Sequence, residues 1–388
     1  MKKTRLLPLA VVPFLLTGCG TVSRYSEHLE DYVFTMQYRK NFNILQLTDI
    51  HWNMNSSIYE SKNYLDKLFE QVKAHAGKID LVELTGDMFM LSNSYQVRSF
   101  INYFEKKSEE YDNFQYAVIW GNHDRHGMYN PNWLGEQFKK AKNAIYYEPN
   151  DDLYGRSNFV INLTEDGTKN TAPKWQISNL DSGASFSETS ISPFRDYDYI
   201  RQDQVDWWVA EQKAASDQAG FSVPGIAYYH IPQDENLKMW NEVEANPASH
   251  RNKFFKLEDF ADNGNEKYAS NFIDTAIKKN LKGAFMGHAH NVDWTVEMTD
   301  DETGNSLLLG LGVKTGIELY YAHIDPASSD PYMQQGLASV GLNEKFDLIG
   351  ASLVTLTDEA DNIEGKYDLE HFYYNERESG DFVKWVKF

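Results

Sequence analysis

Carboxylate, amide and imidazole side chains stand at the ends of successive apolar runs in this sequence. In chain order they are Asp49 and His51, Asp87, Asn122 and His123, His230, and His288 and His290. Each has an ordinary explanation when taken alone, since a lone Asp after a strand often caps a helix and a lone His is often structural. Together they use five of the eleven histidines, and such oxygen and nitrogen donors suit divalent transition metals such as Mn, Fe or Zn. Because one ion cannot take so many donors, the pattern predicts two ions that share a ligand.

The apolar runs before these residues have the pattern of buried strands. Three of them, at residues 43–49, 80–87 and 114–124, alternate with helical spacing at residues 65–72 and 97–106. A strand–helix–strand order with short connections predicts parallel strands with right-handed crossovers. In such sheets the functional groups gather at the carboxyl ends of the strands, which is where the polar residues stand.

The second half of the chain repeats this pattern with longer interruptions. Strand-like runs at 225–232 and 283–290 carry the later histidines, and a polar insertion at about 233–266 lies between them. No linker separates these segments, so the sequence predicts a single α/β domain over residues 41–388. The number of strands favours two sheets over one.

The first twenty residues, MKKTRLLPLAVVPFLLTGCG, resemble a bacterial lipoprotein signal. A basic start and a short apolar segment precede Cys19, so residues 1–18 are predicted to be removed and Cys19 to be lipidated. Residues 19–40 would then supply a tether and a first strand. The expected location is lipid-anchored and exported, at the cell surface or the periplasmic face of a membrane.

The formal net charge is −20, and the chain has one cysteine. The negative surface disfavours nucleic acid as a partner, because it would repel the negatively charged phosphate backbone. A single cysteine excludes a disulfide within one chain. The sequence indicates a small substrate and the membrane as partners, and no protein partner.

Five blocks in order resemble the calcineurin-like metallophosphoesterases, across roughly residues 42 to 300. The blocks are Asp49-Ile50-His51, Gly86-Asp87, Gly121-Asn122-His123-Asp124, His230, and Gly287-His288-Ala289-His290. The resemblance implies two packed mixed β-sheets flanked by helices, in four layers of helices, sheet, sheet and helices. It also implies a site at the strand ends.

The resemblance also implies a role for each of these residues. Asp49, His51 and His290 would bind one metal, Asn122, His230 and His288 the other, and Asp87 would bridge both. His123 would be the general acid, acting with a metal-bridging hydroxide as nucleophile. Asp124, Arg125 and His126 are candidates for supporting these groups or contacting substrate.

Departures from the family narrow the activity. Met90 stands where protein serine/threonine phosphatases have a second Asp, so protein phosphatase activity is disfavoured. Purple acid phosphatases have a tyrosine ligand at the same position, so no tyrosinate-to-iron colour is expected. The expected function is hydrolysis of small phosphomonoesters or phosphodiesters. The alternative is a phospholipid or sphingolipid head-group phosphodiesterase, which the predicted anchor and the segment His230-Ile231-Pro232 favour. A non-catalytic surface-binding lipoprotein would lack a ligand or His123, and none is missing.

Overall fold

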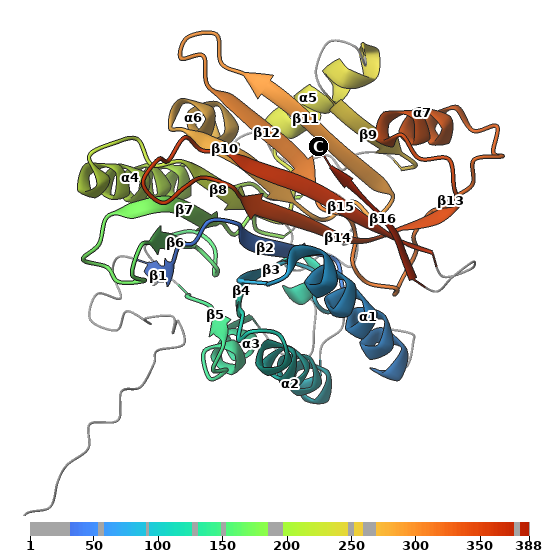
Figure 1. Ribbon diagram of the computed structural model, residues 1–388, viewed down its shortest axis with the longest axis horizontal. Coiled ribbons are helices and arrows are strands. Elements are labelled where there is room, and N and C mark those ends of the chain that lie inside the picture. The colour runs from blue at the N-terminus through green and yellow to red at the C-terminus, as the bar shows by residue number, and fades with distance from the viewer. Residues whose placement is uncertain are drawn as a thin grey trace, which may run out of the picture.

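The computed structural model describes residues 32–52, 58–90, 93–125, 131–148, 153–184, 197–246, 252–258, 269–375 and 381–387. Within these ranges the strands form two eight-stranded sheets, sheet I and sheet II. The sheets pack face to face, and helices cover their outer faces (Figure 1). The predicted four-layer arrangement of two mixed sheets flanked by helices is confirmed.

Sheet I contains the first three strands that the sequence predicts at the site. Its order is β16-β15-β14-β2-β3-β4-β5, with β13 also paired to β14. The strands are β2 (Phe42–Leu47), β3 (Leu81–Thr85), β4 (Gln115–Ile119), β5 (Ala144–Ile145), β13 (His323–Ile324), β14 (Phe346–Leu356), β15 (Tyr367–Asn375) and β16 (Asp381–Lys387). β2 to β5 are parallel, and β14 pairs antiparallel with β2. The outer face carries α1 (Ile58–Ala76), α2 (Ser94–Glu110) and α3 (Pro131–Phe138).

Sheet II contains the strands that precede the later histidines. Its order is β1-β6-β7-β8-β10-β12-β11-β9. The strands are β1 (Val33–Gln37), β6 (Phe159–Thr164), β7 (Pro173–Asn179), β8 (Gly225–Tyr228), β9 (Asn252–Lys256), β10 (Leu281–Met286), β11 (Val292–Thr299) and β12 (Ser306–Leu311). Its outer face packs against α4 (Gln202–Ala219), α5 (Asp234–Ala245) and α6 (Phe272–Lys278), and α7 (Pro331–Val340) lies beside β9.

The described part of the predicted insertion at 233–266 contains α5 and β9. β9 pairs antiparallel with β11 and so forms one edge of sheet II. The first strand, β1, pairs with β6, so the chain enters through sheet II before β2 begins sheet I.

The hydrophobic core between the sheets draws equally on both. Ile44 and Leu81 of sheet I meet Ile177 and Ile226 of sheet II, and all four side chains are fully buried. Strands buried on both faces need continuous apolar runs, which explains the sequence pattern that precedes each polar tip. The packing brings the carboxyl ends of β2, β3 and β4 to the same edge as those of β8 and β10.

Among the described residues no helix is long and apolar enough to cross a membrane. The predicted signal at residues 1–18 and the lipidated Cys19 lie outside the described residues, so both stay predictions.

Candidate metal centre

The turns that follow β2 and β3 are bonded to each other. The Asp49 N–H donates to the Gly86 carbonyl at 3.1 Å and the His51 N–H to the Asp87 carbonyl at 3.0 Å. Asp49, His51 and Asp87 have φ angles of 52°, 47° and 50°, in the left-handed region that residues with a side chain rarely adopt. Such a conformation persists only where surrounding bonds fix it, and it concentrates at functional sites.

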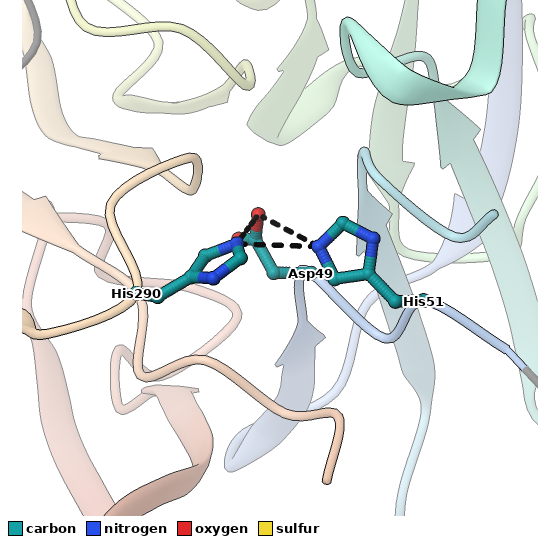
Figure 2. A group of neighbouring side chains, drawn as sticks. All are labelled: Asp49, His51 and His290. Atoms are coloured by element: carbon teal, nitrogen blue, oxygen red, sulfur yellow. Dashed lines mark hydrogen bonds and ion pairs between the residues drawn. The ribbon is translucent and has the colours of Figure 1, made fainter. Parts of the chain in front are cut away.

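One group of candidate ligands consists of Asp49, His51 and His290, whose side chains point toward one another (Figure 2). The Nε2 atom of His290 lies 3.4 Å from Asp49 Oδ1, and that of His51 lies 4.0 Å from the same oxygen. The two Nε2 atoms are 3.2 Å apart. All three residues are buried, and Asp49 Oδ1 has no hydrogen-bond partner among the described residues. A buried carboxylate facing two imidazole nitrogens is a donor set for a cation.

A second group consists of Asp87, His230 and His288, with Asn122 among them. His230 Nε2 lies 3.3 Å from Asp87 Oδ2. The Asn122 Oδ1 atom lies 3.2 Å from His230 Nε2 and 2.9 Å from His288 Nδ1. The carbonyl of Thr85 can only accept, so at 2.9 Å it takes the proton on His230 Nδ1 and leaves Nε2 free to ligate.

The ionisation of the two carboxylates favours cation binding. Burial raises the pKa of Asp87, but the charges of His230 and His123 outweigh it and hold that pKa well below its usual range. The pKa of Asp49 is lowered in the same way, because the effects of His290 and His230 outweigh that of burial. Burial lowers the pKa of His230, yet Asp87 raises it to about 9, so without a metal this imidazole is protonated at neutral pH and must release the Nε2 proton when a cation binds. Burial lowers the pKa of His288 to about 3. Two ionised carboxylates therefore face the imidazoles at neutral pH.

His123 lies beside the second group without belonging to it. It begins a short 3-10 turn, η1 (His123–Arg125), at the end of β4. Its N–H donates to Asp87 Oδ1 at 2.8 Å, and its Nε2 lies 3.9 Å from Asp87 Oδ2. The side chain is 12% exposed, so a molecule at the site can touch it. The predicted role as general acid is compatible with this position.

The two residues after His123 bond to the protein. The Asp124 carboxylate is buried and accepts the N–H groups of Phe89 at 2.8 Å and Gly121 at 2.9 Å, which ties the tips of β3 and β4 together. Burial, followed by the charge of Asp87, raises the pKa of Asp124 to about 8. The Arg125 guanidinium pairs with the carboxylate of Asp181, just after β7. His126 lies outside the described residues.

Sequence reasoning missed four residues that touch this centre. The Tyr197 ring lies 4.3 Å from that of His288, and the Tyr320 ring lies 4.8 Å from that of His290, measured between centroids. Glu258 accepts the N–H groups of His290 at 2.6 Å and of Asn291 at 3.1 Å. Lys314 donates from Nζ to the Asp49 carbonyl at 3.0 Å. These residues stand in loops and follow no motif, so no local signal could have identified them.

The sequence profile described as calcineurin-like phosphoesterase matches residues 42–292 of this chain. The chain belongs to that family. The family resemblance carried by the five sequence blocks is therefore confirmed.

Two relatives and one solved structure resemble the chain at low identity. Phosphatase DCR2 of Saccharomyces cerevisiae is 24% identical over 284 residues, which are 70% of this chain and 47% of the yeast protein. Probable inactive purple acid phosphatase 29 of Arabidopsis thaliana is 24% identical over 286 residues, which are 66% and 69% of the two chains. The structure of purple acid phosphatase PPD1 from yellow lupin (Lupinus luteus) seeds aligns with a TM-score of 0.41 at 11% identity, over 91% of this chain and 55% of that one. The chain thus spans about half the length of the yeast relative.

The donor atoms present fit the binuclear centre that is typical of the family. Each group offers one carboxylate and two imidazoles whose ligand atoms lie within 4.8 Å of one another. Carboxylate and imidazole together suit Zn, Mn or Fe.

Proposed function

We propose that this chain is a binuclear-metal hydrolase of phosphate esters. The observation that carries the proposal is the pair of adjacent donor groups, Asp49 with His51 and His290, and Asp87 with His230 and His288. His123 is partly exposed beside the second group and, among the described residues, is the nearby imidazole that belongs to neither group.

Asp49, His51 and His290 would hold one cation, and Asn122, His230 and His288 would hold the other. Asp87 would contribute to both, as the family resemblance implies. Two such cations lower the pKa of water and offset the charge of the phosphoryl oxygens. The ionised carboxylates, together with the buried Nε2 of His230 at 3.3 Å from Asp87 Oδ2, supply the donor atoms for this role.

His123 protonates the leaving alkoxide, which is a poor leaving group without a proton. Its backbone N–H is fixed to Asp87 Oδ1, so the ring stays beside the shared carboxylate. The ion pair of Arg125 with Asp181 anchors the end of the same turn to sheet II and helps to hold His123 in place.

Small phosphomonoesters or phosphodiesters are the proposed substrates. The net charge of −20 disfavours long nucleic acids, which would be repelled before they reached the cations. The lipoprotein-like signal supports an exported enzyme held at a membrane by a lipid on Cys19. The same anchor motivates the second candidate, hydrolysis of phospholipid or sphingolipid head groups.

The test uses the full chain purified in detergent, stripped of metal and reloaded with Mn, Zn or Fe. Hydrolysis of p-nitrophenyl phosphate and bis-p-nitrophenyl phosphate is measured with Asp87→Ala as control. Metal-dependent turnover that the control lacks is expected, and the better ester separates phosphatase from phosphodiesterase. Head-group release from phosphatidylcholine or sphingomyelin vesicles, with weak turnover of both soluble esters, would favour the lipid substrate.

Two outcomes would contradict the proposed function. Binding of two ions without turnover of any ester would favour the non-catalytic surface-binding lipoprotein. Binding of no metal ion at all would refute both donor groups.

A further inference from the structure

Lys314 is a lysine buried directly behind the first donor group. The residue is 1% exposed. Its Nζ donates to two backbone carbonyls, that of Asp49 at 3.0 Å and that of Gly316 at 2.8 Å. Burying an ammonium costs free energy unless its donors are satisfied, so these two bonds are specific features of the site. Neither bond goes to a group that the proposed function uses as a ligand atom.

The segment around Lys314 lies along the end of β2. Lys314 forms a parallel bridge with Thr48, and the Thr315 N–H donates to the Thr48 carbonyl at 2.8 Å. The Gly316 N–H donates to the Asp49 carbonyl at 3.2 Å. That carbonyl therefore accepts from two donors of one segment, the Lys314 ammonium and the Gly316 amide.

These bonds hold a strained turn. Asp49 and His51 both have positive φ angles, 52° and 47°, which the chain does not adopt without support. The contact is close, since a Cβ added to Gly316 would lie 2.0 Å from the Ile50 carbonyl oxygen. The turn fixed in this way is the one that aims the Asp49 and His51 side chains at His290 (Figure 2).

We propose that Lys314 is a positioning residue for the first metal site. It holds the Asp49 carbonyl, and thereby the turn from Asp49 to His51, in the conformation that presents both side chains to one cation. The inference rests on the proposed function for the identity of the site. The hydrogen bonds from Lys314 and Gly316 to the Asp49 carbonyl, called the clamp below, exist in the chain whatever the site binds. Loss of the ammonium should loosen this turn and weaken one of the two metal sites, leaving the other intact.

The test compares Lys314→Met with Lys107→Met in the metal-free full chain and after metal titration. Lys107 is the matched control: it is also buried, at 7% exposed, and it pairs with Asp66 and Glu110 on the far side of sheet I. Hydrogen exchange of the His51 and Gly316 amides reports the turn without metal. Calorimetric titration with Mn²⁺ and Zn²⁺ reports the two sites.

We expect faster exchange of both amides in Lys314→Met and a 10- to 100-fold weaker affinity at one site, the range seen when outer partners of ligands are removed. Lys107→Met should lower the melting temperature and change neither readout. If Lys314→Met does not fold, Lys314→Gln, which keeps a shorter N–H donor, takes its place with smaller effects expected.

Unchanged exchange of both amides would overturn the clamp. Faster exchange with both affinities unchanged would reduce Lys314 to a stabilising residue with no role in positioning ligands. Faster exchange in the variant, together with no metal binding by the parent chain, would refute the proposed function and leave the clamp standing.

Discussion

A single added methyl group at Gly287 should damage the candidate centre. It follows β10 and precedes His288, and its N–H donates to the His230 carbonyl at 3.1 Å. A Cβ at this position would lie 2.0 Å from Thr48 Oγ1 and 2.9 Å from Asp49 Oδ2. The hydroxyl it would strike is the one that donates to Asp49 Oδ2 at 2.8 Å.

The size of the effect follows from these distances. Ordinary contact begins at 3.4 Å, so the methyl group and the hydroxyl must separate by 3.4 − 2.0 = 1.4 Å. A displacement of about 1 Å in a catalytic group can reduce the rate about 100-fold. Gly287→Ala should therefore lower kcat/KM by about 100-fold, or about 2.7 kcal/mol. Overpacking should also cost about 1–3 kcal/mol of unfolding free energy.

The assay measures kcat/KM for both nitrophenyl esters, bound metal per chain, and urea unfolding. Gly225→Ala is the control, because Gly225 starts β8 at the end away from His230 and its Cβ would meet its nearest atoms at 3.1 and 3.2 Å. The control should keep parental kcat/KM. Parental kcat/KM and metal content in Gly287→Ala would refute the view that this turn is packed against the Asp49 carboxylate.

Three further predictions concern metal removal, pH and the rim of the site. Chelation should lower the melting temperature of the parent more than that of Asp87→Ala, because a cation at 100 times its Kd adds about 2.7 kcal/mol and the variant lacks the shared carboxylate. Equal shifts in both would contradict this prediction. Burial raises the pKa of Glu83 well above its ordinary value of 4.5, and the Asn179 side chain opposes this only in part. The folded chain therefore keeps a proton that the unfolded chain loses. The unfolding free energy then falls as pH rises above about 4.5, by up to about 1.4 kcal/mol per unit, and Glu83→Gln should gain stability over the metal-free parent between pH 5 and 7 in urea unfolding. Tyr320 is 55% exposed and its ring packs on His290. Steady-state kinetics should show that Tyr320→Ala raises KM about 2- to 10-fold and that Tyr320→Phe leaves KM unchanged.

The sequence predicted the architecture because its signals are local. β2, β3 and β4 are buried on nearly every residue, so their apolar runs could be recognised, and the polar tips followed directly. The seven predicted ligands meet because all stand at carboxyl ends of strands or in the turns after them. Their roles, and those of His123 and Asp124, remain predictions that the experiments above address.

The rest depends on contacts that only the folded chain creates. Lys314 reaches Asp49 across 265 positions of sequence, and Arg125 finds Asp181 across 56. The path of β1 into sheet II depends on its pairing with β6, which no periodicity in residues 32–38 encodes. Tyr197 and Tyr320 were two among 24 tyrosines, and nothing in the sequence around them distinguishes the pair.

The division of the ligands between the sheets has a consequence for the lifetime of the fold. The strands of sheet I lead to Asp49, His51, Asp87 and Asn122. The strands of sheet II lead to His230, His288 and His290. Each donor group draws on both sheets, so a bound cation would cross-link two layers whose contacts, such as His51 with His290, span 239 positions. Contacts of such sequence separation are expected to form late in folding, and interactions absent from the transition state act on the unfolding rate. Metal should then leave the folding rate unchanged and slow unfolding, so the chain should become resistant to proteases only after its ions have bound.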